Sequence, residues 1–218
     1  MKFQKIYDNS PIFFQHFMAT VYGYKVKLER YGEEYYRYRS FLRRFGRLPR
    51  EEQQKYQLKE LKILIEYAVN KSSFYKKFYK NINIDNIKDI KDLDKLPILT
   101  KDLLRKNIQE IITIPKNKGV EAHTGGTTGT SLITYFSHRD NQQRMATLDY
   151  FKELHGFENM MMTRATFNGK HIIPPTQKKK EFWRYNAAIK QMIYSSFHIN
   201  EKNIPYYIQS LNKLKPQS

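Results

Sequence analysis

One short segment of the sequence combines residue types that can hold a phosphate group. Residues 123–132 read HTGGTTGTSL, which places Gly125, Gly126 and Gly129 among four threonines. Glycine allows the backbone to turn sharply, and a concave run of N–H and hydroxyl donors matches the oxygens of a phosphate. The spacing is neither that of a Walker A loop, because no Gly-Lys-Ser/Thr follows, nor that of the dinucleotide pattern GxGxxG. An ordinary turn between two strands explains this composition equally well.

Other side chains are weaker candidates for contacts with a ligand. His198 follows the expected end of a strand, where the sites of α/β proteins lie. Together with Ser196 and His123 it is a candidate contact for substrate or nucleotide, and a structural role is the alternative for each histidine. Although Ser195 and His198 are close in sequence, no Ser/His/Asp assignment follows from them.

A few basic residues are candidates for holding an anion. These are the lysines at 178–180, for which a solvated loop is the simpler explanation, and the arginines Arg164 and Arg184. Paired catalytic carboxylates are not visible in the sequence, and neither are clusters of His with Asp or Glu that would bind a metal. The sequence therefore predicts no metal ligand among the protein's side chains.

The elements that must position the Gly/Thr segment change character near residue 119. Before it the patterns are mainly helical, over residues 24–46, 51–68, part of 70–81 and 101–107, the last capped by Thr100. After it strands are expected at 119–123, 132–136, 160–167 and 188–195, and helices follow Ser137 and close near Lys215. We therefore expect an α/β protein with a helical N-terminal region over 1–118 and an α/β region over 119–218.

The helix expected after Ser137 has an apolar repeat at three-residue steps. Its members are Met145, Leu148, Phe151 and Leu154, and Gly156 follows as a suitable terminating residue. The repeat predicts that these four side chains form the buried face of the helix.

The segment from Thr124 to Thr130, TGGTTGT, resembles the phosphate-binding loop of the adenylate-forming superfamily, the acyl-CoA synthetases and their relatives. Its surroundings are similar to the phenylacetate–CoA ligase-like branch, and within it to homologues found with capsular polysaccharide biosynthesis genes. The similar segments are LKILIEYAVNKSSFY and LDKLPILTKDLLRKN before the loop, and FWRYNAAIKQMIYSSFHIN and YIQSLNKLKPQ after it. The resemblance covers residues 20–218 and keeps the order of these motifs.

The resemblance implies a two-step reaction with ATP and Mg²⁺. A carboxylate attacks the α-phosphate to give an acyl-adenylate and pyrophosphate, and a thiol, usually coenzyme A, then accepts the acyl group. By position, Thr124, Thr127, Thr128 and Thr130 are the hydroxyl donors, while Gly125, Gly126 and Gly129 supply backbone contacts to the nucleotide. Many members have Pro-Lys or Pro-Thr after the loop, whereas this chain has Ser131-Leu132, so no lysine contribution is expected there.

The same resemblance implies that the chain is the N-terminal half of such an enzyme, in which residues 119–218 are part of an α/β nucleotide-binding subdomain. Members run to about twice this length and carry the adenine, ribose and Mg²⁺ contacts and a catalytic lysine beyond the stretch found here. We therefore expect the isolated chain to adenylate little or nothing, unless a partner chain supplies the missing half. A non-catalytic subunit or assembly partner is the alternative function.

The composition of the chain excludes some classes of protein and leaves one further function open. Cysteine is absent, so the chain has neither a disulfide framework nor a cysteine nucleophile. No apolar run of about 18 residues is present, and the N-terminus lacks a secretory pattern, so a cytoplasmic location without a membrane span is expected. The 39 Lys+Arg against 21 Asp+Glu give a net charge of +18. This charge is spread along the chain, with one local concentration between Lys25 and Arg50. It leaves nucleic-acid binding as a second alternative, although no specific nucleic acid is expected.

Overall fold

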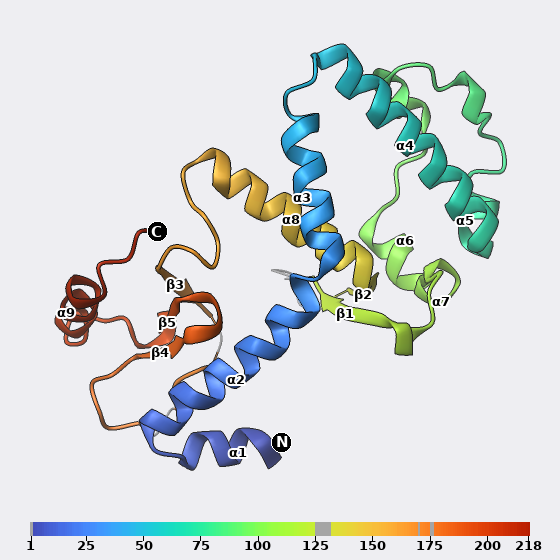
Figure 1. The fold of residues 1–218 in the computed structure, drawn as a ribbon. Helices are drawn as coiled ribbons and strands as arrows, with labels where there is room; N and C mark the ends of the chain where they lie inside the picture. The colour runs from blue at the N-terminus through green and yellow to red at the C-terminus, as the bar shows by residue number, and fades with distance from the viewer. Residues whose placement is uncertain (1, 125–131, 170, 175–176) are drawn as a thin grey trace. The chain divides into compact units, whose positions relative to one another are not determined.

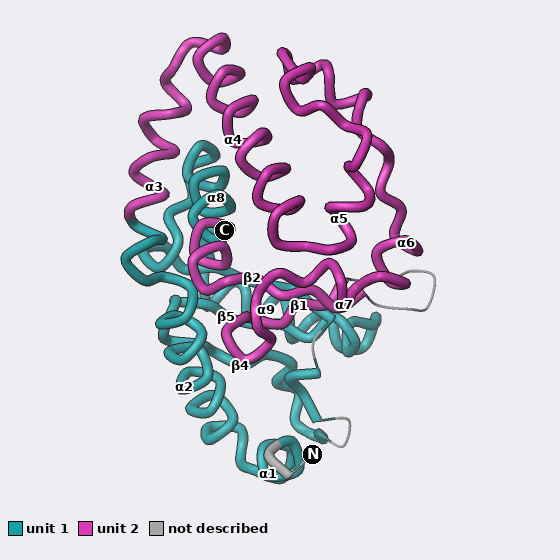
Figure 2. The backbone as a smooth tube through the Cα atoms, turned by 90° about the vertical axis from the view of Figure 1, so that its right-hand side faces the viewer, with its two compact units in different colours: residues 1–36, 145–218 teal, residues 37–144 magenta. Residues whose placement is uncertain are grey.

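The computed structural model describes residues 2–124, 132–169, 171–174 and 177–218 (Figure 1). The chain is a mixed α/β protein with a helical N-terminal region, as the sequence predicts. It divides into two compact units, residues 1–36 with 145–218 (unit 1) and residues 37–144 (unit 2), shown in two colours in Figure 2. The expected boundary between residues 118 and 119 falls inside unit 2 and stays a prediction.

The helices and strands follow one another in a simple order. The helices are α1 (Lys2–Asn9), α2 (Ile12–Arg30), α3 (Glu33–Phe45), α4 (Arg50–Lys71), α5 (Ser73–Phe78), α6 (Lys101–Lys106), α7 (Ile108–Ile111), α8 (His138–Leu154) and α9 (Ile204–Leu214). The strands are β1 (Gly119–His123), β2 (Ile133–Ser137), β3 (Arg164–Asn168), β4 (Trp183–Asn186) and β5 (Gln191–Ser195). Short 3₁₀ turns include η2 (Ile90–Lys95), η3 (Lys116–Lys118), η4 (Ala187–Ile189) and η5 (Ser196–His198).

Unit 1 is built on a three-stranded sheet of order β3-β5-β4. Strand β5 runs parallel to β3 and antiparallel to β4. On one face the buried rings Phe182, Tyr194 and Tyr207 form a core, and Leu211 and Leu214 of α9 pack against it. The aromatic and leucine side chains of this face therefore explain why α9 docks there.

The other partner of this sheet is α2, which packs against β4 and η4. Polar contacts set its position: the Tyr185 N–H donates to His16 Nδ1 at 2.7 Å, and the Ala187 N–H donates to Thr20 Oγ1 at 3.1 Å. Gly23 is buried at the same contact, where an added Cβ would lie 2.0 Å from Asn186 Oδ1. Only a glycine permits α2 to approach the sheet this closely.

Unit 2 consists of packed helices and one hairpin. Helix α5 packs against α4 and α7, and the Ser72 hydroxyl caps α5 while donating to the Glu110 carbonyl at 2.7 Å. The Thr100 side chain caps α6 by accepting from the Leu103 N–H at 3.2 Å, as predicted. Strands β1 and β2 pair antiparallel with Gly119 opposite Ser137 and His123 opposite Ile133.

Helix α8 buries a different face from the one predicted. Met145 is buried, but the other three members of the apolar repeat are 46%, 60% and 64% exposed: Leu148, Phe151 and Leu154. The prediction for these three residues is therefore wrong. Gly156 does terminate the helix region with a φ of +80°, as expected.

The face of α8 that is buried contains a carboxylate. Asp149 is 2% exposed and accepts hydrogen bonds from the Tyr35 hydroxyl at 3.0 Å and from Asn159 Nδ2 at 2.7 Å. Lys152 Nζ lies 3.4 Å from the same carboxylate. Because a buried charge needs such partners, these polar contacts determine which face of α8 turns inward.

Candidate functional site

The hairpin of β1 and β2 brackets the Gly/Thr segment. The Thr124 N–H donates to the Leu132 carbonyl at 3.0 Å, and the Leu132 N–H donates to Thr124 Oγ1 at 3.0 Å. These two bonds continue the ladder one step past His123 and Ile133, so that Thr124 and Leu132 are held opposite each other. The two ends of the segment are therefore joined by one backbone–backbone hydrogen bond and one bond to the Thr124 side chain.

Most of the predicted phosphate loop lies outside the described residues. This applies to Gly125, Gly126, Thr127, Thr128, Gly129 and Thr130. Thr124 is the one predicted loop residue with a described position, at the end of the β1–β2 ladder. The predicted contacts of all seven residues with nucleotide stay predictions.

A small polar cluster lies on the exposed face of the hairpin. His123 Nε2 is 2.9 Å from Glu121 Oε1, and the Tyr135 hydroxyl donates to Glu121 Oε2 at 3.1 Å. The hydrogen bond from His123, followed by that from Tyr135, lowers the pKa of Glu121. His123 therefore has a carboxylate partner next to the loop, and its predicted contact with substrate or nucleotide remains untested.

His198 and Ser196 lie at the corner where β5 meets η5. His198 Nδ1 is 2.8 Å from Ser195 Oγ, and the ring stacks on Phe182 with centroids 5.3 Å apart. The Ser196 hydroxyl donates to the Asn168 carbonyl at 2.8 Å, which ties the ends of β5 and β3 together. These contacts give each side chain a structural role.

The Ser195–His198 pair brings together two residues whose types can perform nucleophilic catalysis. Ser195 is 1% exposed, so its hydroxyl has no access to a substrate in this arrangement. Burial and then the neighbouring His171 lower the pKa of His198, which favours the neutral imidazole. The geometry is that of a buried hydrogen bond at a corner of the fold, and the role of His198 as a ligand contact stays a prediction.

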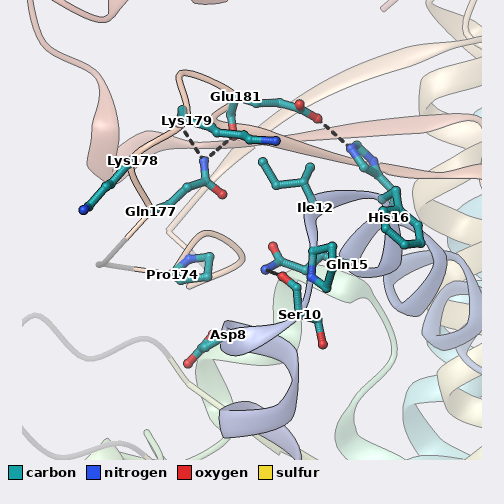
Figure 3. Close-up of a pocket in the computed structure, with 12 residues that line it drawn as sticks. Asp8, Ser10, Ile12, Gln15, His16, Pro174, Gln177, Lys178, Lys179 and Glu181 are labelled. Atoms are coloured by element: carbon teal, nitrogen blue, oxygen red, sulfur yellow. Dashed lines mark hydrogen bonds and ion pairs between the residues drawn. The ribbon is translucent and has the colours of Figure 1, made fainter.

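The lysine run at 178–180 borders a pocket of about 630 Å³ in unit 1 (Figure 3). Lys178 and Lys179 line it, and so do the acidic Asp8 and Glu181. Glu181 Oε1 lies 2.7 Å from His16 Nε2 across this region. Because charges of both signs line the pocket, it offers no general preference for an anion.

The two candidate arginines have very different surroundings. Arg184 is 0% exposed, and its Nε donates to Gln15 Oε1 at 2.8 Å. Its Nη1 donates to the carbonyls of Glu181 and Trp183 at 3.1 and 2.6 Å, and its Nη2 donates to Gln15 and Gln177. Arg184 thus holds α2 and β4 together rather than facing a ligand.

Arg164 lines a cleft between α2 and the sheet, together with Lys27 and Arg30. Sequence reasoning did not find this cleft as a site. The alternation of β3 predicts that its polar residues Arg164, Thr166 and Asn168 share one face. The other cationic residues of the cleft come from α2, more than a hundred residues earlier, so no local pattern brings them together.

The described part of the chain meets neither the requirements of a metal site nor those of a membrane-spanning helix. No group of three His, Asp or Glu side chains there could hold a metal ion. Among the helices described in the structure, none is both long and apolar enough to cross a membrane.

The described residues thus define a mixed α/β protein with a helical N-terminal region and a β-hairpin whose strands β1 and β2 flank the Gly/Thr segment in the sequence. In sequence the chain is 37% identical to Protein CapK of Staphylococcus aureus over 214 residues, which cover 98% of this chain and 46% of CapK. The chain is a homologue of CapK and spans about half the length of that curated relative. No protein-family model matches it, and no solved structure does.

Proposed function

We propose that the chain takes part in a carboxylate-activating, adenylate-forming reaction of capsular polysaccharide biosynthesis, in which its Gly/Thr segment binds the phosphates of ATP. The observation that carries this proposal is the β1–β2 hairpin, in which hydrogen bonds join Thr124 and Leu132, at the two ends of the Gly/Thr segment in the sequence. Homology to CapK over nearly the whole chain supports the link to the capsule.

The chain's own contribution is to orient and neutralise phosphate oxygens. ATP, when bound, supplies the adenylyl group that activates the carboxylate. The hydroxyls of Thr127, Thr128 and Thr130 and the N–H groups of the glycines are donors of the kind that stabilise charge on phosphate oxygens. Positioning and charge neutralisation of the phosphates by such donors are main contributions to nucleotidyl transfer.

The proposed reaction also involves Mg²⁺ and coenzyme A, which the family resemblance implies. No group of three His, Asp or Glu side chains among the described residues could hold the metal. The thiol acceptor and the carboxylate substrate would be recognised in large part by the half of the relative that this chain does not match.

Binding of ATP to the purified chain in the presence of Mg²⁺ tests the proposal. A hydrogen bond to a charged group contributes about 1.5–3 kcal/mol, so the double variant Thr127→Ala/Thr128→Ala should bind at least about tenfold more weakly. Ser40→Ala, on the exposed surface of α3, is the matched control and should bind like the wild type. Equal affinity of the loop variant and the wild type would overturn the proposal.

Activity gives a second test of the same proposal. Because the chain spans 46% of CapK, we expect no carboxylate-dependent exchange of pyrophosphate into ATP by the chain alone. Exchange should be restored when the polypeptide equivalent to the rest of CapK is added. Pyrophosphate exchange by the chain alone would contradict this expectation, because the 218 residues would then be sufficient for adenylation.

A second candidate function is assembly with another polypeptide, and one feature of α2 favours it. The outer face of α2 carries five large apolar side chains, each between 52% and 79% exposed, at spacings of three and four residues. They are Phe13, Phe17, Val21, Tyr24 and Leu28. An apolar stripe of this length is typical of a helix covered by a partner.

The partner that we propose for this stripe is the polypeptide equivalent to the unmatched part of CapK. Co-purification of the two polypeptides should be lost in the variant Phe17→Glu/Leu28→Glu. Ile98→Glu, at an 86% exposed apolar residue of unit 2, should leave it intact. Co-purification that survives the α2 variant would exclude this face.

A further inference from the structure

The cleft beneath α2 has an unusual charge for its size. Its volume is about 310 Å³, close to the lower end for small-molecule sites. Lys27, Arg30 and Arg164 line it, and His171 lies at its edge. None of the lining residues that the structure describes is acidic. The cleft therefore concentrates positive charge in a confined space.

The cleft is lined by polar side chains of all three strands, next to apolar ones such as Ile193. Gln191 and Asn186 line the cleft from β5 and β4, and Asn168 lines it from β3. Gln191 Nε2 donates to Thr166 Oγ1 at 2.8 Å, so this part of the lining is a hydrogen-bonded layer. Tyr7, Tyr22 and Tyr31 line the same cleft. Amides and hydroxyls beside aromatic rings are suited to a hydroxylated ligand.

Arg164 has an unused buried donor at this place. Its Nε is buried and makes no hydrogen bond, although buried polar groups in proteins nearly always have a partner. The nearest buried carboxylate, Asp149, already accepts from Tyr35 and Asn159 and lies close to Lys152. Burial lowers the pKa of the Arg164 guanidinium, Tyr31 and Asp149 oppose this, and Arg30 adds to it by repulsion. A bound anion would relieve the repulsion between the guanidinium groups of Arg30 and Arg164.

We propose that this cleft binds a hydroxylated organic anion of the class of sugar acids and sugar phosphates. Its carboxylate or phosphate oxygens lie between Arg30 and Arg164, and its hydroxyls meet the amides of Asn168, Asn186 and Gln191. Every residue in this proposal belongs to unit 1, whereas the Gly/Thr loop belongs to unit 2. The proposal is therefore independent of the one made for ATP.

Titration of the full chain with three matched probes tests the site. The probes are glucuronate, glucose 6-phosphate and neutral glucose, followed by calorimetry and by the shift in thermal unfolding. We expect saturable binding of at least one anionic probe, and the better one identifies the acidic group as carboxylate or phosphate. Glucose should bind at least tenfold more weakly, because it lacks the charge that the two arginines recognise.

Substitutions then locate the bound probe. Arg164→Gln and Arg30→Gln should each weaken the anionic probe at least tenfold, whereas Arg47→Gln, an exposed arginine of unit 2, should leave its affinity unchanged. Arg30 and Lys27 are half-buried residues of α2. The variants Arg30→Gln and Lys27→Gln therefore still test the site if Arg164→Gln fails to fold. The proposal is overturned if glucose binds as well as the anions, if no anionic probe saturates, or if the cleft variants bind like Arg47→Gln. None of these results bears on ATP binding by the Thr127→Ala/Thr128→Ala variant.

Discussion

Replacing Gly23 by alanine tests how closely α2 approaches the sheet. The added methyl group would lie 2.0 Å from Oδ1, 2.6 Å from Cγ and 2.6 Å from Nδ2 of Asn186. Asn186 is itself buried, and its Oδ1 accepts a hydrogen bond from the Ala188 N–H at 3.1 Å, which caps η4. The methyl group therefore cannot be accommodated unless Asn186 moves and releases that cap.

The expected cost follows from three contributions. Overpacking of a close contact costs about 1–3 kcal/mol, and loss of the hydrogen bond to Ala188 costs about 0.5–1.5 kcal/mol. The greater helix preference of alanine over glycine returns about 0.5–1 kcal/mol. We therefore expect Gly23→Ala to lower the free energy of unfolding by about 2 kcal/mol.

Urea unfolding of a double-mutant cycle separates this clash from other effects. In the background Asn186→Gly the side chain that clashes is absent, so Gly23→Ala should there be neutral or stabilising by up to about 1 kcal/mol. A wild-type background in which Gly23→Ala is harmless would refute the packing of α2 on β4. The same penalty in both backgrounds would show that Asn186 is not its cause.

Three further substitutions test other parts of the structure. Tyr35→Phe removes the hydroxyl that donates to the buried Asp149 and should cost about 1.5–3 kcal/mol in urea unfolding; a change within error would contradict the network. Thr100→Ala removes the cap of α6 and should cost about 1 kcal/mol, seen as faster amide exchange in α6 and not in α9. Burial, and then His171, lower the pKa of His198 below its ordinary value of 6.5. Below pH 6.5 the unfolded chain therefore binds more protons at this residue than the folded chain does. The free energy of unfolding should fall as the pH drops from 6.5 through the lower folded-state pKa. His198→Gln should flatten that acid limb, and an unchanged slope would assign it to other groups.

Local signals predicted the hairpin and several helix ends well. Strand β1 spans Gly119–His123 as expected, and the Thr100 cap and the Gly156 turn are where the sequence places them. These features depend on a few neighbouring residues, such as a threonine hydroxyl that reaches a backbone N–H or a glycine with positive φ. Sequence reasoning is therefore sufficient for them.

Features set by contacts distant in sequence were predicted poorly. The apolar repeat of α8 predicted a buried face, but Asp149 is buried instead because Tyr35, more than a hundred residues away, donates to it. Strand β5 begins at Gln191, later than predicted, since η4 and the positive φ of Lys190 precede it. Strand β4 was not predicted at all, because its short WRYN segment becomes a strand through pairing with β5.

The candidate sites divide in the same way. The Gly/Thr segment is recognisable from adjacent residues, and its role in binding phosphate stays a prediction. The cationic cleft joins Arg30 to Arg164 through the packing of α2 on the sheet, which no local pattern contains. Arg164 and Arg184 look alike in sequence, yet Arg184 is saturated by Gln15, Gln177 and two carbonyls.

The central claim is that the Gly/Thr segment binds the phosphates of a nucleotide. The most direct measurement is titration of the ¹⁵N-labelled chain with ATP and Mg²⁺, followed through the amide resonances of Gly125, Gly126 and Gly129. The account predicts that these three resonances shift together and saturate, and that Thr127→Ala/Thr128→Ala weakens the effect. Resonances of the three glycines that stay in place while ATP binds elsewhere, or does not bind, would contradict it.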